Sequence, residues 1–241
     1  MNSFSADVTF NLARVRERIA AAADRAGRRA SEITLVAVSK TFPAEAIRAA
    51  YDAGLRHFGE NRVQEWDSKQ SSLADLEATW HLIGHLQSNK ARRAAFLFNR
   101  VDSLDDLSLA QRLHAAADAE GKSLPVLIEV HLGGEESKSG VAEKDLPGLA
   151  AAVAPFAHLD LIGLMTVPPF FEEPERVRPF FRRLHELRDD LASRLGRPLP
   201  VLSMGMSHDF EIAIEEGATE IRVGSALFGA RTANPAHPVT P

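Results

Sequence analysis

The sequence predicts a single α/β domain folded as a TIM-type (β/α)₈ barrel. Short runs of apolar, often β-branched residues alternate with longer segments in which apolar residues recur at helical spacing. Such alternation is typical of βα units, whose strands pair in a parallel sheet. About eight units within 241 residues fit a closed barrel better than an open doubly wound sheet, which stays the alternative because two strands are very short. No linker or change of composition in residues 1–241 marks a second domain.

The clearest strand, Ile33–Val38, follows an amphipathic leader helix that ends near Gly27. A β-branched run of this kind is typical of a parallel strand that is covered on both faces. Pro43 and Gly54 fit the first position and the C-terminal cap of the next helix. Further strands are expected at Arg56–Gly59, Thr79–Ile83, Arg100–Val101, Leu124–Val130, Leu159–Leu164, Val201–Leu202 and Glu220–Val223. Helices are expected at Asn61–Leu76, Asn89–Phe98, Ser103–Ala119 with Ser103 as the cap, Ala142–Ala154, Glu175–Leu195 and Asp209–Glu216, and a short helix ends the series.

The composition argues against several classes of protein. The chain has no cysteine, so disulfides, thiolate catalysis and cysteine-based zinc sites are excluded. Its net charge of −5 argues against nucleic acid as the main partner, because nucleic acid is bound by basic patches. Residues 1–30 lack a signal or transit pattern, and the most apolar stretch, 149–171, is interrupted by prolines and polar residues. We therefore expect a cytoplasmic protein that does not bind membranes.

Polar residues gather at the expected carboxyl ends of the strands, where barrel proteins carry their functional groups. Lys40 ends the first strand. By position alone it is a lysine that extends past the rim to solvent. A desolvated lysine at this place would instead be an amine nucleophile toward carbonyl compounds. The other strand-end groups are Gly59–Arg62, Gly84–Gln87, Met165–Thr166, Ser203–Ser207 and Arg222–Ser225.

Two of these loops have the composition of a phosphate site. Ser203–Ser207 and Gly224-Ser225 each lead into a helix, and their small residues let backbone N–H groups approach a ligand. The loops after strands seven and eight are the usual phosphate site of this barrel, although ordinary glycine-rich turns are the alternative. A phosphate site beside a nucleophilic lysine indicates a phosphorylated sugar, as in a lysine aldolase, or pyridoxal 5′-phosphate (PLP).

Arg222 partly separates these two ligands. An arginine that faces the pyridine nitrogen of PLP would keep this nitrogen unprotonated, whereas an aspartate would protonate it and strengthen the electron sink. The alternative is a surface arginine or an ion-pair partner of Glu220.

Seven motifs, in order, resemble those of the PLP homeostasis protein family. The resemblance extends from about residue 8 to residue 231. Any one motif is weak, but seven in the family's order are specific. The motifs are Val38–Lys40, His57–Asn61, Trp80–Lys90, Glu136–Gly140, Gly163–Thr166, Leu202–Ser207 and Arg222–Gly224.

The resemblance implies a fold-type III PLP barrel, similar to the N-terminal domain of alanine racemase, that spans residues 1–241 and holds PLP as a Schiff base on Lys40. It implies that Arg222 faces the pyridine nitrogen. It further implies a phosphate site at Ser207, Gly224 and Ser225, and pocket residues at Asn61, His85 and Met206. The family usually has Val-Asn after the fifth strand, whereas here His131 follows Val130. His131 is therefore either an altered pocket edge or a structural histidine.

The same residues favour a binding protein over an enzyme. Alanine racemase uses a tyrosine from a separate β-domain as its second base, and the 241 residues leave no room for that domain after the last expected helix. The only tyrosine, Tyr51, is expected on a helix. We therefore assign no catalytic residue and no metal ligand. A weakly active, racemase-like amino-acid enzyme and a PLP-free lysine aldolase are the alternatives.

The partners expected for such a protein are PLP and the apoenzymes that accept PLP. A barrel without a second domain is expected to be a monomer. Lys138, in the loop after the fifth strand, is either a second lysine that takes up PLP or a solvated loop residue.

Overall fold

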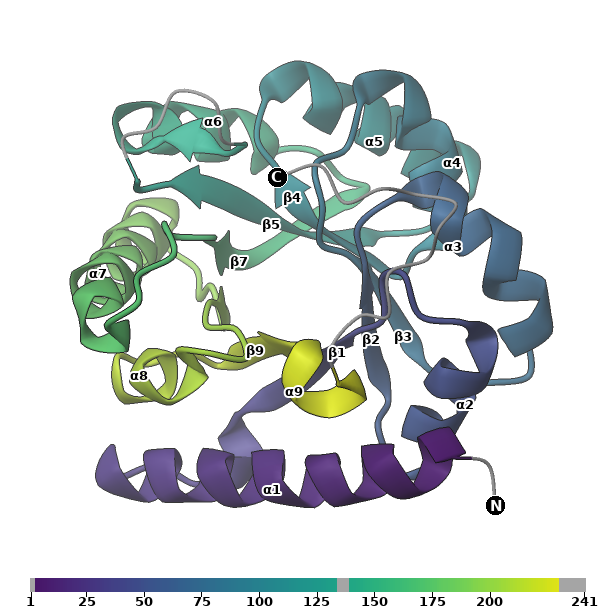
Figure 1. Cartoon of the computed structure of the whole chain (residues 1–241). Helices are drawn as coiled ribbons and strands as arrows, with labels where there is room; N and C mark the ends of the chain where they lie inside the picture. The colour runs from purple at the N-terminus through teal and green to yellow at the C-terminus, as the bar shows by residue number, and fades with distance from the viewer. Residues whose placement is uncertain (1–2, 134–138, 230–241) are drawn as a thin grey trace.

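The structure, a computed structural model, describes residues 3–133 and 139–229. Within these residues, eight parallel strands close into a barrel that is surrounded by helices (Figure 1). The strand order is β4-β3-β2-β1-β9-β8-β7-β5, and the pairing of β4 with β5 closes the ring. A two-residue strand, β6, pairs with the end of β5 outside the ring. The predicted barrel is confirmed, and the open sheet is excluded.

The alternation of strands and helices follows the order that the sequence predicted. The strands are Thr34–Val38 (β1), His57–Glu60 (β2), Thr79–Leu82 (β3), Arg100–Leu104 (β4), Leu124–His131 (β5), Val141–Ala142 (β6), Leu159–Met165 (β7), Val201–Ser203 (β8) and Glu220–Val223 (β9). The helices are Ser3–Arg25 (α1), Ala44–Asp52 (α2), Val63–Lys69 (α3), Ala91–Leu97 (α4), Leu107–Ala119 (α5), Leu146–Val153 (α6), Arg178–Leu195 (α7), Phe210–Glu215 (α8) and Ser225–Phe228 (α9). Short 3₁₀ turns extend several helices, such as Gln70–Leu73 after α3.

The prediction that Ser103 caps the fifth helix is wrong. Ser103 lies inside β4, and its hydroxyl donates to the carbonyl of Gly84 at 2.7 Å. The cap of α5 is Asp106, whose carboxylate accepts from the N–H of Leu109 at 2.8 Å. The strand was expected to be shorter because its polar residues break the apolar pattern, yet all five residues of β4 are buried.

Helix α1 has a structural role that the sequence did not indicate. The last βα unit has only the four-residue helix α9. Helix α1 packs against α2, α8 and α9, and Figure 1 shows it lying along this side of the barrel. It therefore fills the place in the outer layer that the eighth helix takes in a regular barrel.

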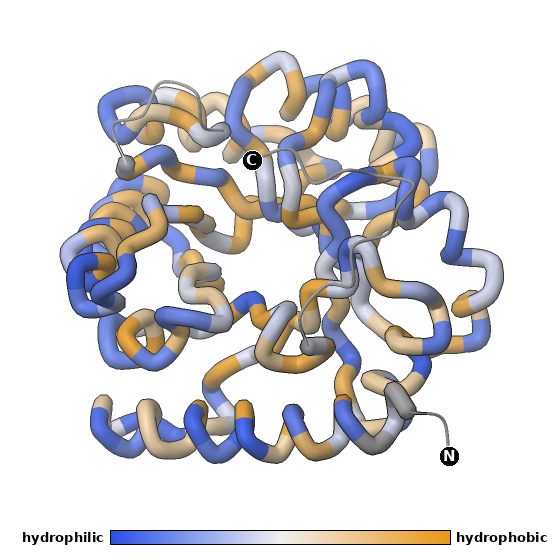
Figure 2. The backbone as a smooth tube through the Cα atoms, in the orientation of Figure 1, coloured by the Kyte–Doolittle hydropathy of each residue, from blue (hydrophilic) through white to orange (hydrophobic). Residues whose placement is uncertain are grey.

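The core lies inside the barrel and between its strands and helices. Hydrophobic residues dominate the strands, whereas the helices alternate hydrophobic and hydrophilic residues (Figure 2). Strands β7 and β8 approach so closely that a Cβ atom at Gly163 would lie 1.8 Å from the carbonyl oxygen of Val201, so only glycine fits there. No helix in the described ranges is both long and apolar enough to cross a membrane.

Candidate functional site

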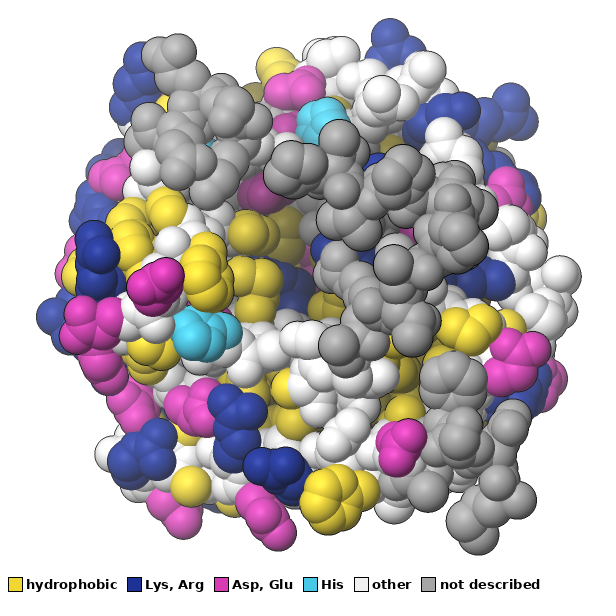
Figure 3. All heavy atoms as spheres, in the orientation of Figure 1, with side chains coloured by type: hydrophobic (Ala, Val, Ile, Leu, Met, Phe, Trp, Pro, Cys, Tyr) yellow, Lys and Arg dark blue, Asp and Glu magenta, His cyan; other side chains and the backbone are white. Residues whose placement is uncertain are grey.

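The carboxyl ends of the barrel strands meet at one face, which we call the mouth. Figure 3 shows the face that carries α9, where hydrophobic side chains line a hollow and basic side chains are visible within it. Lys40, two residues beyond the end of β1, lies at the mouth and is half-buried. Its place therefore differs from that of a lysine that extends freely into solvent.

Strands β1 and β9 bring Lys40 close to the predicted phosphate loops. They pair in parallel, with Ala37 opposite Val223. A Cβ atom at Gly224 would lie 3.4 Å from both the Cβ and the carbonyl oxygen of Val38. Gly224 therefore lies directly beside the end of β1, two residues before Lys40.

The two loops after β8 and β9 meet at the hydroxyl of Ser207. This oxygen accepts from the N–H groups of Gly224 and Ala226, each at 3.3 Å. The Met206 N–H donates to the carboxylate of Asp209 at 2.6 Å, which orders the loop before α8. A hydroxyl and two backbone N–H groups at one point are the kind of donors that bind a phosphate.

Arg222 points into the barrel beneath the mouth. Glu220 lies two positions before Arg222 on the same face of β9. Its carboxylate accepts a hydrogen bond from Arg100 on β4, the strand on the opposite side of the ring, so this face of β9 points into the barrel. Arg222 itself is buried, and it donates to the hydroxyl of Ser203 at 2.7 Å and to the carbonyl of Thr166 at 2.8 Å. It is therefore not a surface arginine, and Glu220 is bound by a different arginine from the one the sequence suggested.

The mouth also contains a buried acid that the sequence did not indicate. Glu129 on β5 is 7% exposed. Burial raises the pKa of Glu129 to about 7, against the opposing charge of Arg222, and the negative charge of Asp105 adds to the rise. His85 lies 3.3 Å from Asp105, nitrogen to oxygen, at the exposed rim. Glu129 was missed because it lies within an apolar strand and belongs to no motif.

Comparison with known proteins decides the family. The alanine racemase N-terminal domain family matches residues 10–232. A pyridoxal phosphate homeostasis protein from Pseudomonas aeruginosa is 51% identical over 221 residues, which is 92% of this chain and 94% of the relative. The chain belongs to the pyridoxal phosphate homeostasis protein family.

Solved structures agree with this assignment. PipY from Synechococcus elongatus, solved with PLP bound, is 38% identical and superposes with a TM-score of 0.82, covering 92% of this chain and 100% of PipY. An alanine racemase from Corynebacterium glutamicum is 18% identical, with a TM-score of 0.71 over 94% of this chain and 62% of the racemase. At this low identity, the racemase shows a shared fold alone.

The positions predicted from the homeostasis family motifs lie at the mouth. Asn61 follows β2 and His85 follows β3, and the two strand ends approach so closely that a Cβ atom at Gly84 would lie 2.4 Å from the carbonyl oxygen of Asn61. Met206 is half-buried, whereas Ser225 is exposed at the start of α9. The structure thus brings the predicted residues to one face, and their contacts with a ligand stay predictions.

His131, the departure from the family pattern, is the last residue of β5 and lies two positions beyond Glu129 on the same face of the strand. Its buried Nε2 atom has no hydrogen-bond partner among the described residues. Buried polar atoms are almost always hydrogen-bonded, so this nitrogen marks a place where a ligand could supply a partner. Lys138 lies outside the described residues.

A second buried charged cluster lies at the opposite end of the barrel interior. Arg100 contacts the carboxylates of Asp102 and Glu220 at 2.5 Å, and Asp102 lies 3.3 Å from His81. Burial alone would raise the pKa of Asp102, but Arg100 and His81 hold it below its usual range. Among the described residues, His81, Asp102 and Glu220 are close enough to share a metal ion, but the Arg100 guanidinium lies between the two carboxylates.

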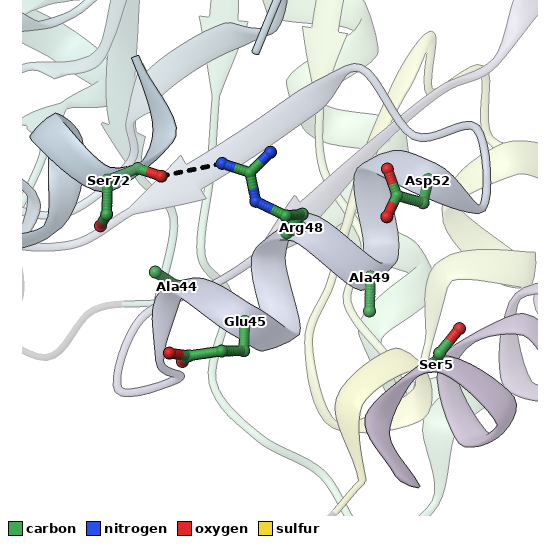
Figure 4. Close-up of a pocket in the computed structure, with 7 residues that line it drawn as sticks. All are labelled: Ser5, Ala44, Glu45, Arg48, Ala49, Asp52 and Ser72. Carbon is green, nitrogen blue, oxygen red and sulfur yellow. Dashed lines mark hydrogen bonds between the residues drawn. The ribbon is translucent and has the colours of Figure 1, made fainter. Parts of the chain in front are cut away.

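Two other features lie away from the mouth. Tyr51 is in the last turn of α2, which runs back toward the amino ends of the strands, and Arg56 stacks on its ring at 3.9 Å. A surface hollow lies between α1, α2 and the turn after α3, where Arg48 donates to the carbonyl of Ser72 (Figure 4). The residues that line this hollow include none of the predicted site residues.

Proposed function

We propose that this protein binds PLP as a Schiff base on Lys40 and acts in PLP homeostasis. Its close relatives carry the name pyridoxal phosphate homeostasis protein, and PipY, which matches over its whole chain, was solved with PLP bound. The observation that supports the proposal is the position of Gly224. Gly224 lies beside Val38 at the end of β1, two residues before Lys40, and its N–H donates to the Ser207 hydroxyl.

These residues fit the parts of PLP. The phosphate would be held by the Ser207 hydroxyl and the N–H groups of Gly224 and Ala226, with Ser225 at the edge of this site. Bound PLP supplies one aldehyde carbon, which the Lys40 amine captures with loss of water. Asn61, His85 and Met206 would border the ring, and the unpartnered nitrogen of His131 would face the same pocket.

Arg222 would donate a hydrogen bond to the pyridine nitrogen. Its guanidinium is fixed by Ser203 and Thr166, so it presents its N–H groups in one orientation. Arginine does not give up its proton in proteins, so it leaves the pyridine nitrogen unprotonated. An unprotonated ring is a weaker electron sink than a protonated one, which suits a protein that holds the cofactor, and arginine partners also occur in PLP enzymes.

The placement of Tyr51 supports the same conclusion. It is the only tyrosine in the sequence, and it lies on an outer helix far from the mouth. The catalytic base of a racemase would therefore have to be another group. We propose that the chain is a carrier without a dedicated reaction, and that its partners are apoenzymes that accept PLP.

We further propose that residues 1–241 form one domain that acts as a cytoplasmic monomer. The absence of cysteine fits a reducing compartment. Among the described residues, the most exposed large apolar side chains are spread over α1, α4, α5 and the loop after β7, whereas a stable dimer interface would bring such side chains into one broad patch. They are Phe10, Phe96, Leu107, Val167 and Phe170.

Borohydride reduction of the PLP-treated protein, followed by peptide mapping, tests the site. We expect a single reduced adduct on Lys40 and a visible absorbance band before reduction. Lys40→Ala should lose both, whereas Lys122→Ala, at the opposite end of the barrel, should keep both. An adduct mapped to Lys90 or Lys138 in the wild type would refute the assignment of Lys40.

The carrier role is tested separately, by deuterium washout from the α-carbon of a panel of amino acids. We expect no more than trace exchange over many hours. Sustained turnover at about 1 per second or faster, as in ordinary enzymes, would contradict the carrier role and favour an amino-acid enzyme.

A further inference from the structure

The turn that carries Lys40 has an unfavourable backbone conformation. The N–H of Phe42 donates to the carbonyl of Ser39 at 3.1 Å, which closes a turn with Lys40 and Thr41 at its centre. Thr41 has a φ of 68°, in the left-handed region that β-branched residues disfavour. Such a conformation persists only where neighbouring contacts impose it.

Lys69, the last residue of α3, makes contacts of this kind. Its ammonium group donates to the carbonyl oxygens of Ser39 and Phe42, each at 3.2 Å. These two residues flank Lys40 and Thr41 on either side. The Lys69 side chain is only 11% exposed, so this group is held inside the structure. One buried group therefore fixes both ends of the turn.

Two carboxylates hold Lys69 in this position. Glu60, the buried last residue of β2, lies 2.8 Å from the Lys69 nitrogen and accepts from the Ser39 hydroxyl at 2.7 Å. Glu65 lies 3.0 Å from the same nitrogen and accepts from the Thr41 N–H at 2.5 Å. Each carboxylate thus contacts both the ammonium and the turn. Lys69, Glu60, Glu65 and the turn 39–42 form one network, which we call the Lys69 cluster.

We propose that Lys69 is a positioning residue for Lys40, and that it holds the 39–42 turn in the conformation that presents the Lys40 amine to the aldehyde carbon of PLP. This inference rests on the proposed function, which gives Lys40 its carbonyl partner. Positioning matters because a displacement of about 1 Å between reacting groups can slow a reaction by about 100-fold. The N–H groups of Lys69 already face four oxygen atoms, so Lys69 supports the nucleophile and does not replace it.

The variants are chosen so that the fold survives. Removing Lys69 alone would leave the buried Glu60 carboxylate without its cation, which strongly destabilises proteins. The comparison is therefore between Glu60→Gln and the double variant Glu60→Gln/Lys69→Met, which differ only at the ammonium. Lys122→Met is the control for loss of an unrelated lysine. Circular dichroism and a thermal melt verify that each variant is folded.

Two rates are measured on each folded variant. The first is the growth of the visible band on mixing with PLP. The second, in the absence of PLP, is the acetylation of each lysine by a limiting N-hydroxysuccinimide ester, read by mass spectrometry. We expect the double variant to capture PLP about tenfold more slowly than Glu60→Gln, because a loosened turn no longer aligns Lys40. We expect its Lys40 to be acetylated faster, because the half-buried amine becomes more exposed, while Lys90 and Lys144 keep their rates.

The two rates separate this inference from the proposed function. PLP capture rates that agree within about twofold between the two variants would overturn the positioning role. A wild-type protein that takes up no PLP on Lys40 would overturn the proposed function instead. In that case, an unchanged acetylation rate of Lys40 would still refute the claim that Lys69 holds the turn.

Discussion

Replacing Glu129 with glutamine should make the cofactor-free protein more stable at neutral and alkaline pH. Burial in the mouth raises the pKa of this carboxyl from its ordinary value of 4.5 to about 7. A tenfold change in an ionisation equilibrium corresponds to about 1.4 kcal/mol, so this rise amounts to about 3 kcal/mol. Glutamine has nearly the same shape as the protonated acid but never ionises, so its variant should avoid this cost.

The direction of the pH dependence follows from where the proton is bound more tightly. The folded state binds the Glu129 proton more tightly than the unfolded state, so the wild type loses stability as pH rises from about 4.5 to about 7 and levels off above that. The glutamine variant should therefore exceed the wild type by about 3 kcal/mol at pH 8 and by about 1 kcal/mol at pH 5.

Urea unfolding of both proteins without PLP, from pH 5 to pH 8, measures this difference. Glu77→Gln, which alters an exposed acid, is the matched control for the replacement of one carboxylate by an amide. A stability difference for Glu129→Gln that stays constant over this range would show that the carboxyl is not held in its protonated form, and would refute the reasoning.

Three further outcomes follow from the described contacts. Ser207→Ala should weaken PLP binding about tenfold or more, which is the loss expected for hydrogen bonds to a charged phosphate. Binding of unphosphorylated pyridoxal should stay unchanged. Equal losses of affinity for both ligands in an absorbance titration would contradict the phosphate site. Arg100→Met leaves two buried carboxylates without their cation and should lower the free energy of unfolding by about 3–5 kcal/mol. Urea unfolding measures this loss, and an unchanged unfolding midpoint would contradict the buried cluster. Gly163→Ala would put a Cβ atom 1.8 Å from the Val201 carbonyl oxygen. It should lower the free energy of unfolding by more than the usual overpacking penalty of about 1–3 kcal/mol. A far-UV circular dichroism spectrum and a melting temperature equal to those of the wild type would contradict this prediction.

The barrel could be predicted because its strands carry strong local signals. Strand β1 is a β-branched run between a helix and a proline, and parallel pairing then leaves few topologies. Lys40 and the loops at Ser207 and Gly224 could be located because strand ends in a barrel share one face. These features depend on the order of elements along the chain, which the sequence states directly.

Other features depend on contacts that join distant parts of the chain. Glu129 gives no local sign that it shares the mouth with Arg222, because only closure of the barrel brings β5 and β9 across from each other. In the sequence, Lys69 is an ordinary lysine at the end of a helix. Its role depends on the packing of α3 beside the turn of Lys40, which the sequence does not indicate. Strand β4 was expected to be too short because Asp102 and Ser103 break its apolar pattern. The pairing of Arg100 with Asp102, which lets both charges be buried inside the barrel, becomes visible only in the structure.

Helix α1 joins the barrel wall through contacts between residues far apart in the sequence. Arg18 binds Glu211 across 193 positions of sequence, stacks on the ring of Phe210, and donates to the carbonyl of Ser207 at 3.5 Å. These contacts join residues that lie far apart in the sequence, which raises the contact order and slows folding. A substitution at Arg18 would therefore remove a contact between α1 and the loop that carries Ser207.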